Sequence, residues 1–339
     1  MAIVGGFDLH RRQITFDCMD TETGELKRGR IMPVDRLTLR GWLERFKGLE
    51  GDFAVEAGTG WRFVVEELTR AGLRAHLADP GETAALRGSK RRAKTDRADA
   101  RHETQLLLEG RLPEAWIPPA GVLEIRTLGR LYMDLCEERR AWCQRIKAQL
   151  FHQGCPAVPG SIGPRTRGVF VDLELTPAGR RSVDTALRMV DALDVEIRQL
   201  RRDLARFARR HPGCRGLLSL YGIGPLTAAL IWAEMGDTRR FSSSRQAVRH
   251  TGIDVTVYST DGKRVSGYLS RQGPPVLRWA LYEAAKCGAK SGSPDHDYYA
   301  AVRDRLGSKR ATLSLARKIA RRAHHVLRAL GDGAWVEAA

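Results

Sequence analysis

The chain has 339 residues, of which 42% are hydrophobic and 29% charged, and these fractions are typical of a folded globular protein. Lysine and arginine number 57 against 40 for aspartate and glutamate, so the formal net charge is +17. Such an excess favours an acidic partner, and nucleic acid is the commonest polyanion in a cell. The sequence lacks an apolar run of about 18 residues, which excludes a transmembrane helix, and its start lacks the pattern of a secretory signal.

The six cysteines are scattered without a Cys-x-x-Cys pair, so we expect neither a disulfide framework nor a zinc ribbon. This cysteine usage is typical of a reduced, cytoplasmic compartment. The length is suited to two modest domains and a connector. Shifts in pattern along the chain place their boundaries at 1–119, 120–212 and 213–339.

The first segment alternates between strand-like and helix-like stretches. Helices are predicted from Leu37 to Phe46 and over 61–71, because apolar residues recur there at helical spacing. Short apolar runs bounded by turn residues predict strands at 2–7, 13–19, 26–31, 53–55 and 75–78. Three strands followed by alternating helix and strand predict an α/β domain.

Four acidic residues of this segment stand at the ends of its predicted elements. Asp8 ends the first strand, and Glu56 follows the fourth. Asp96 and Asp99 begin a further helix with Thr95 as N-cap, and their spacing of three puts both carboxylates on one helical face. Mg²⁺ requires hard oxygen ligands, and two such ions can hold the attacking and leaving oxygens at a phosphodiester. Each acid alone is more often structural, but this ordered set favours a metal site.

The second segment is helical and heavily charged. Apolar spacings that alternate between three and four predict a long helix with a coiled-coil seam at Val190, Leu193, Ile197, Leu200, Leu204 and Phe207. A weaker seam on an earlier helix consists of Leu128, Leu131, Leu135, Trp142 and Ile146. Two such helices form either an antiparallel hairpin or a dimerising coiled coil, and the pattern does not choose between them.

The third segment is predicted to be mainly helical, with an element like a helix-hairpin-helix at Gly222-Ile223-Gly224-Pro225. Glycines allow positive φ and leave backbone N–H groups at a helix start, where a phosphate can bind without any base being read. Gly222 and Gly224 are therefore expected nucleic-acid contacts, and the alternative is a tight turn that serves packing alone. A final helix over 312–330 has one apolar face and a basic remainder, which would strengthen polyanion binding.

A polar, basic stretch follows that element and contains Ser259, Thr260 and Lys263. An exposed serine hydroxyl near cations and a metal can attack phosphorus. A serine in a polar turn more often bonds to the local backbone, and the residues alone favour that structural role.

Three motifs of the first segment resemble those of the DEDD transposases of bacterial insertion sequences: Phe7-Asp8-Leu9-His10-Arg11, Val55-Glu56-Ala57-Gly58 and Lys94-Thr95-Asp96-Arg97-Ala98-Asp99-Ala100. That family includes the Piv-type DNA invertases and the bridge-RNA-guided recombinases. The resemblance implies an RNase H/RuvC-like fold for 1–119. It also implies that the four acids bind Mg²⁺, or Mn²⁺ in its place.

The stretch from Leu218 to Ala285 resembles the second conserved region of the same family. The match makes Ser259 a nucleophile that bonds covalently to DNA, and Thr260 the less favoured neighbour. Asp261 departs from the family pattern, which has glycine there, and Leu269 and Arg271 are milder departures. The nucleic-acid contacts expected in this region are Lys263, Arg264, Arg271 and Arg278.

The resemblance implies a site-specific recombinase or transposase of an insertion sequence, which cuts and rejoins DNA through a serine–phosphodiester intermediate. It implies a structured noncoding guide RNA, a dimer or tetramer in which the metal site of one subunit works with the serine domain of another, and a place in the bacterial cytoplasm at the nucleoid.

Two other functions compete with that interpretation. A metal-dependent, structure-selective nuclease such as a junction resolvase would not need Ser259. An architectural nucleic-acid-binding protein would need Asp8 and Asp99 for stability alone. The complete set of four acids argues against the architectural protein, and the C-terminal motifs argue against the plain nuclease.

Overall fold

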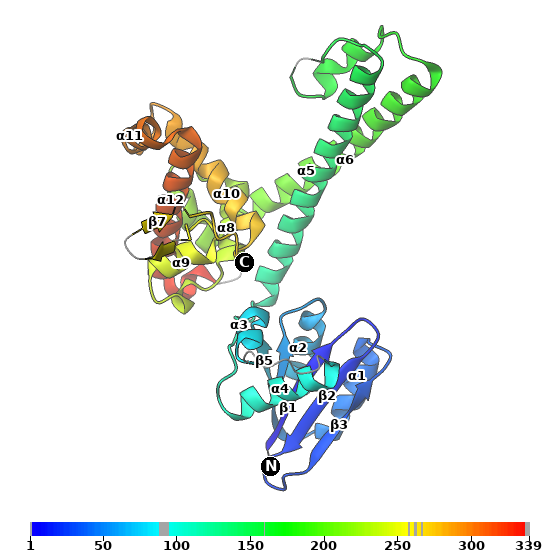
Figure 1. Cartoon of the computed structure of the whole chain (residues 1–339), viewed down its shortest axis with the longest axis vertical. Helices are drawn as coiled ribbons and strands as arrows, with labels where there is room; N and C mark the ends of the chain where they lie inside the picture. The colour runs from blue at the N-terminus through cyan, green and yellow to red at the C-terminus, as the bar shows by residue number, and fades with distance from the viewer. Residues whose placement is uncertain are drawn as a thin grey trace. The chain divides into compact units, whose positions relative to one another are not determined.

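The computed structural model describes residues 2–87, 95–158, 160–256, 258–260, 263–265 and 267–335. The chain divides into two compact units, Met1–Ile117 and Pro118–Ala339 (Figure 1). Within the described ranges no helix combines the length and the apolarity that crossing a membrane requires.

The first unit is built on a five-stranded sheet in the order β3-β2-β1-β4-β5. β1, β2 and β3 are antiparallel neighbours, whereas β4 runs parallel to β1 and β5 runs parallel to β4. The strands are β1 (Ala2–Leu9), β2 (Ile14–Asp20), β3 (Leu26–Ile31), β4 (Glu50–Glu56) and β5 (Arg74–Ala78). The helices are α1 (Arg36–Leu43), α2 (Trp61–Arg70), α3 (Pro80–Ala85) and α4 (Asp96–Leu108), with a 3₁₀ turn at Glu44–Phe46. The α/β class expected for this part of the chain is confirmed.

One face of this sheet carries the apolar core. Side chains alternate along a strand, and the register pairs Phe7 of β1 with Val55 of β4, so both point to the same face as Phe53. Trp42 of α1 packs there, with its ring centroid 5.5 Å from that of Phe7 and 6.2 Å from that of Phe53. Leu68 of α2 is fully buried in the same cluster. This face therefore anchors α1 and α2.

Helix α4 covers the opposite face of the sheet (Figure 1). Gly6 and Asp8 point to this face, because residues alternate between the two faces along β1. A Cβ atom on Gly6 would lie 2.4 Å from the carbonyl oxygen of Ala100. This is a steric clash, so only glycine fits at this position. Thr104 Oγ1 donates to the carbonyl oxygen of Asp17 at 2.9 Å and fixes the helix against β2. The close packing places the polar residues of α4 directly on the strands.

The second unit begins with two long helices, α5 (Ala120–His152) and α6 (Pro177–Arg210), that pack against each other (Figure 1). Arg139 of α5 pairs with Asp194 of α6, with Nε 2.5 Å from Oδ1. The loop end is closed where the backbone N–H of Thr176 donates to Gln153 Oε1 at 2.8 Å. The sequence left two arrangements open, and the structure forms the antiparallel hairpin within one chain. Supercoiling of the two helices along the predicted seam stays a prediction.

The buried residues of the hairpin differ from the expected seams. Leu131 is 44% exposed, whereas Tyr132 is buried. The reason is that this end of α5 packs against helices beyond the hairpin: a Cβ atom on Gly129 would lie 2.6 Å from Leu230 Cδ2, and the Tyr132 ring centroid is 6.1 Å from that of Trp279. On α6 the buried seam residues are Val190, Leu200 and Leu204, and the other three seam positions are partly exposed.

The remaining helices of the second unit pack around α8 and α12. They are α7 (Pro212–Leu218), α8 (Pro225–Met235), α9 (Ser244–His250), α10 (Pro275–Lys286), α11 (His296–Leu306) and α12 (Ser308–Leu330). A two-stranded ribbon is formed by β6 (Tyr258–Thr260) and β7 (Lys263–Val265). Short 3₁₀ helices lie at Pro164–Phe170, Thr238–Arg240, Cys287–Ala289 and Gly331–Ala334. The mainly helical class expected here is confirmed.

His211, where α6 meets α7, provides a test of this packing. Its ring packs against those of Phe207 and Trp232, with centroids 5.0 and 4.2 Å away, and the residue is 2% exposed. Burial lowers the pKa of His211 to about 4, because the charged imidazolium loses its hydration there.

We predict that His211→Phe makes the protein less sensitive to acid. The unfolded state protonates His211 near pH 6.5 and the folded state does so only near pH 4, so stability is lost as the pH falls through this window. Between pH 7.5 and 5 the wild type should lose about 2 kcal/mol more than the variant in urea unfolding. His152→Phe, at an exposed position, is the control and should follow the wild type. Parallel pH profiles for wild type and His211→Phe would contradict the assignment.

Candidate functional site

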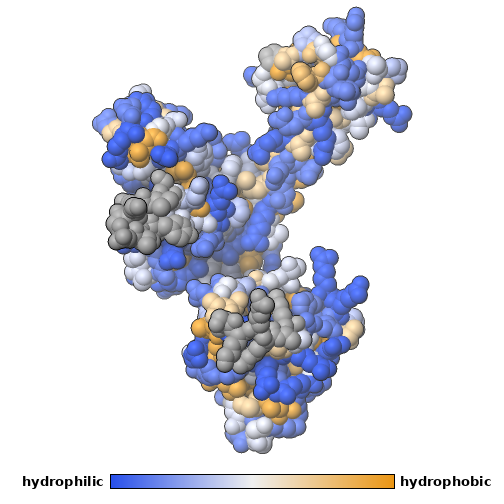
Figure 2. All heavy atoms as spheres, viewed as in Figure 1, coloured by the Kyte–Doolittle hydropathy of each residue, from blue (hydrophilic) through white to orange (hydrophobic). Residues whose placement is uncertain are grey.

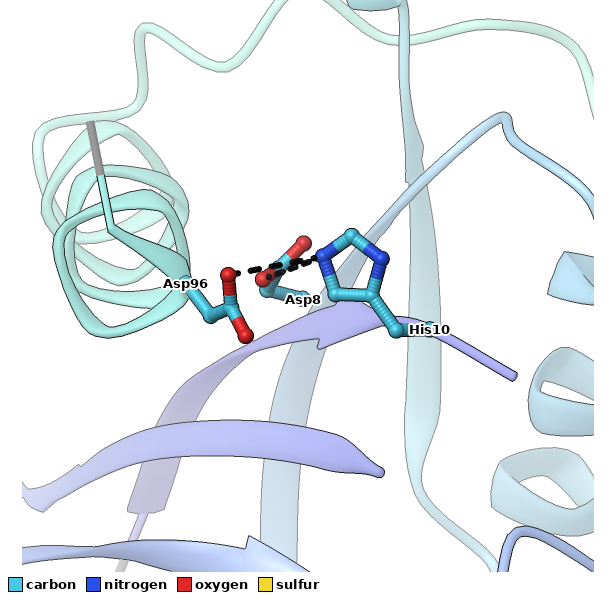
Figure 3. Close-up of side chains that lie close together, drawn as sticks. All are labelled: Asp8, His10 and Asp96. Carbon is cyan, nitrogen blue, oxygen red and sulfur yellow. Dashed lines mark ion pairs between the residues drawn. The ribbon is translucent and has the colours of Figure 1, made fainter. Parts of the chain in front are cut away.

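Asp8, His10 and Asp96 form a cluster at the carboxyl end of β1 (Figure 3). Asp8 lies on the strand and His10 just beyond it, while Asp96 reaches the cluster from the first turn of α4. His10 Nε2 lies 3.1 Å from Asp8 Oδ2 and 3.6 Å from Asp96 Oδ1. One ligand atom from each of the three residues lies within 4.8 Å of the others, so the cluster could hold a metal ion.

Glu56 and Asp99 approach the same end of the sheet. Phe7 of β1 is paired with Val55 of β4 in the parallel register. Asp8 and Glu56 are the next residues along these two strands, so they lie side by side at the strand ends. Asp99 follows Asp96 by three residues on α4. The structure therefore brings the four predicted acids to one end of β1, β4 and α4.

The Asp8 carboxyl is buried, with the residue 8% exposed. Burial is the main cause that raises the pKa of Asp8 to about 6; the charges of Asp96 and Asp99 raise it too, and His10 lowers it. Apart from the ion pair with His10 Nε2 at 3.1 Å, Asp8 Oδ2 has no hydrogen-bond partner among the described residues. A buried carboxylate oxygen whose one close partner is an imidazole, beside further carboxylates, fits a hard divalent cation.

Two neighbours hold the acids of α4. Gln13 Nε2 donates to Asp96 Oδ2 at 2.7 Å, and Arg87 Nη1 lies 2.5 Å from Asp99 Oδ1. Together with His10, these groups offset part of the repulsion between carboxylates. Thr95 caps the helix as expected, because its side chain accepts from the N–H of Ala98.

Glu103 of α4 is a fifth acid near this cluster, and sequence reasoning missed it. The residue is 1% exposed, and burial followed by the charges of Glu56 and Asp8 raises its pKa well above the usual range. The signal was present in the sequence, since residues 96, 99 and 103 share one helical face. No sequence signal marked His10, Gln13 or Arg87 as neighbours of the acids.

In the second unit, Ser259 lies on β6, whose register pairs it with Arg264 and pairs Thr260 with Lys263. The ribbon continues through an antiparallel bridge between Val255 and Leu269. Asp261, which departs from the family pattern, lies outside the described residues.

Two contacts fix the base of this ribbon. The Thr256 N–H donates to the carbonyl oxygen of Tyr268 at 2.9 Å. A Cβ atom on Gly267 would lie 1.4 Å from the carbonyl oxygen of Thr256, so glycine is required there. The base of the ribbon is therefore tightly closed.

Arg271 and Arg278 lie together beside the ribbon. Arg271 is exposed and adopts φ of +54°, a left-handed conformation that is uncommon without glycine. Arg278 Nη1 donates to the carbonyl oxygen of Arg271 at 3.3 Å and to that of Gly273. Burial, and then the charge of Arg271, lower the pKa of Arg278. Arg278 thus supports the loop that presents Arg271.

Gly222 and Gly224 lie in the turn between α7 and α8, where Gly222 is tightly packed and a Cβ atom on Gly224 would meet open space. Gly222 has φ of +89°, and a Cβ atom on it would lie 2.4 Å from the carbonyl oxygen of Ala284 on α10. Gly224 precedes α8 and donates its N–H to Thr227 Oγ1 at 2.9 Å. The close contact of Gly222 supports the packing alternative for that residue, and phosphate binding at this turn stays a prediction.

The last turns of α6 carry a basic groove that sequence reasoning did not single out. Its volume is about 640 Å³. Most of the face shown in Figure 2 is hydrophilic, with apolar side chains scattered among polar ones. The groove is lined by Arg198, Arg201, Arg202, Ala205, Arg206, Arg209 and Arg210. A row of guanidinium groups of this kind suits a phosphodiester backbone.

We predict that Gly6→Ala disturbs the acidic cluster through backbone packing. The new methyl would overlap the Ala100 carbonyl, so α4 must shift, at a cost of about 1–3 kcal/mol. Hydrogen exchange measured by mass spectrometry should be faster in peptides from α4. Gly41→Ala, where the added methyl meets open space inside α1, is the control and should slightly stabilise the protein. Unchanged exchange in α4 of Gly6→Ala would show that the contact does not hold the helix.

Comparison with protein families matches both parts of the chain. A model described as "Transposase IS116/IS110/IS902 family" matches residues 214–300. A second model, for the DEDD transposases of IS110 and described as "Transposase", matches residues 5–153. The two matches cover the acidic motifs and the serine-containing region.

Similar proteins include three from bacteria. "Putative transposase y4rJ" of Sinorhizobium fredii is 30% identical over 257 residues, which are 68% of this chain and 63% of that protein. The transposase for insertion sequence element IS1111A of Coxiella burnetii is 28% identical over 42% of this chain and 41% of its own length. The transposase for insertion sequence element IS1328 of Yersinia enterocolitica is 28% identical over 47% and 48%, respectively. The matches thus span less than two thirds of the length of each relative.

Proposed function

Since the chain belongs to the IS116/IS110/IS902 family of transposases, we propose that it is an insertion-sequence transposase that cuts and rejoins DNA. The observation that carries the proposal is the cluster of Asp8, His10 and Asp96 at the end of β1, with Glu56 and Asp99 beside it. Acidic groups gathered at one end of a sheet, on a chain of net charge +17, fit a metal-dependent reaction on a polyanion.

The first unit is proposed as an RNase H/RuvC-like domain. Asp8, Glu56, Asp96 and Asp99 would hold Mg²⁺ or Mn²⁺, because carboxylate oxygens are the ligands these ions prefer. A bound ion would polarise the phosphoryl group and stabilise negative charge on its oxygens. His10 would hold Asp8 and Asp96 together until the ion binds.

The second unit would supply the nucleophile. The Ser259 hydroxyl loses its proton and forms an ester bond to phosphorus, while the bond from phosphorus to the departing deoxyribose oxygen breaks and that oxygen takes up a proton. Attack by a strand-end hydroxyl on the phosphoserine reverses these steps and releases the serine. Lys263, Arg264 and Arg271 would bind the phosphate, and Arg278 would fix the loop that carries Arg271.

The proposed partners are DNA, a structured noncoding guide RNA and further copies of this chain, in a dimer or tetramer. A basic protein that leaves sequence choice to base pairing needs to hold backbones, for which the arginines of α6 are suited. The proposed parts are 1–119, the connector 120–212 and the serine-bearing part 213–339, acting at the nucleoid in the cytoplasm.

We predict that wild-type protein with Mg²⁺, labelled element-end DNA and RNA transcribed from the element's flanks forms a covalent protein–DNA adduct on a denaturing gel. Ser259→Ala should reduce the adduct to background, because the attacking oxygen is gone. Asp99→Ala should do the same, because the metal site loses a ligand. Thr260→Ala is the matched control, since it removes the neighbouring hydroxyl, and it should keep the adduct.

Cleavage that continues without an adduct in Ser259→Ala would sink the serine mechanism. It would favour the metal-dependent nuclease, for which the serine is dispensable.

We predict that the basic groove of α6 contributes to the salt dependence of nucleic-acid binding. Substituting Arg202, Arg209 and Arg210 with glutamine removes three charges from the groove. The slope of log affinity against log salt should fall by about 2–3, because fewer counterions are released. The control is the glutamine substitution of Arg303, Arg305 and Arg310, which removes the same charge elsewhere in the unit. An equal loss of slope in this control would show that the groove has no special role in nucleic-acid binding.

A further inference from the structure

Glu103 is a buried acid with one carboxylate oxygen that lacks a hydrogen bond to any described residue. The residue is 1% exposed, and its Oε2 makes no hydrogen bond within the described part of the chain. A buried, unbonded carboxylate is costly, and an apolar side chain of similar size would fill the same space at no such cost. A carboxylate at this position therefore points to a ligand.

The packing of α4 determines where this carboxylate lies. A Cβ atom on Gly6 would lie 2.9 Å from Glu103 Cβ, so the Glu103 side chain starts directly over β1. Asp8 is two residues further along the strand and points to the same face. The Glu103 side chain thus begins beside the strand position that leads into the acidic cluster.

The charged groups around the Glu103 carboxyl come from every element of the proposed site. They are Glu56 of β4, Asp8 of β1, Asp99 of α4 and Arg87, which follows α3. Arg87 is the one cation among them, and it pairs with Asp99. Because this cation is already paired with Asp99, the three acids carry an excess of negative charge that a divalent ion would neutralise.

We propose that Glu103 is a fifth acidic residue of the metal site, with Oε2 available to the ion or to a water molecule bound to it. The proposal rests on the proposed metal-dependent function and extends its ligand set from the end of the sheet into the buried face of α4. Asp8 Oδ2, which pairs only with His10, and Glu103 Oε2, which makes no hydrogen bond within the described residues, are then the two buried oxygens that the ion satisfies.

The test is Mn²⁺ binding by the full chain at pH 7.5, measured by the electron paramagnetic resonance signal of free Mn²⁺ and by the shift in melting temperature that Mn²⁺ causes. Glu103→Gln keeps the size of the side chain and removes its charge. It should weaken Mn²⁺ binding at least tenfold and shrink the thermal shift, while melting no lower than the wild type without metal. Glu109→Gln, at the exposed end of the same helix, should bind Mn²⁺ like the wild type.

Asp8→Asn separates the failure of this inference from the failure of the proposed function. If Asp8→Asn loses Mn²⁺ binding and Glu103→Gln keeps it, Glu103 is not part of the site, and the metal site of the other acids stands. If the wild type and Asp8→Asn bind Mn²⁺ equally, or neither binds it, the proposed metal site itself is wrong and Glu103 falls with it.

Glu103→Asp keeps the test decisive if Glu103→Gln does not fold, as judged by circular dichroism. The aspartate side chain keeps the charge but is one methylene shorter, so its carboxylate lies farther from the ion. The affinity for Mn²⁺ should therefore fall to a value between those of the wild type and Asp8→Asn. Wild-type affinity in a folded Glu103→Asp would overturn the proposal.

Discussion

The contact between α4 and β1 at Gly6 is the constraint on which the acidic site depends. Without a side chain at Gly6, the backbone of the helix can rest on the strand, with the Ala100 carbonyl where a Cβ atom would otherwise be. The acids of α4 are thereby brought against those of β1 and β4, although carboxylates repel one another. The apolar core on the other face of the sheet, which includes Trp42, keeps the strands rigid, so the repelling carboxylates stay in place.

Much of the first unit could be predicted from the sequence, because its strands are short apolar runs and the start of α4 has a clear cap at Thr95. The four acids could be found because each stands at the end of an element. Glu103 shares a helical face with Asp96 and Asp99 and was within reach of the same reasoning. His10 was not, since its position depends on how the chain turns after β1. In the same way, the buried side of α5 is set by Leu230 and Trp279, which are distant in sequence.

The chemistry-bearing residues of the chain are held in two different ways. The acids sit on regular elements whose register is set by the sheet. Ser259 sits on a short ribbon whose base is closed by Gly267 and by backbone bonds, next to a loop in which Arg271 is held at positive φ. A non-glycine residue in that conformation stores strain, and such strain is common where a side chain must be presented in one direction.

Gly129 shows that the start of α5 is an integral part of the C-terminal core. The side chain of Leu230 fills the space where a Cβ atom of residue 129 would be, and Tyr132 of the same helix lies by Trp279. A fragment that began at residue 213 would expose these apolar surfaces of α8 and α10 to water and invite aggregation. For dissection of the protein by truncation, the natural cut is therefore near Pro118, with the whole helical hairpin kept on the C-terminal piece.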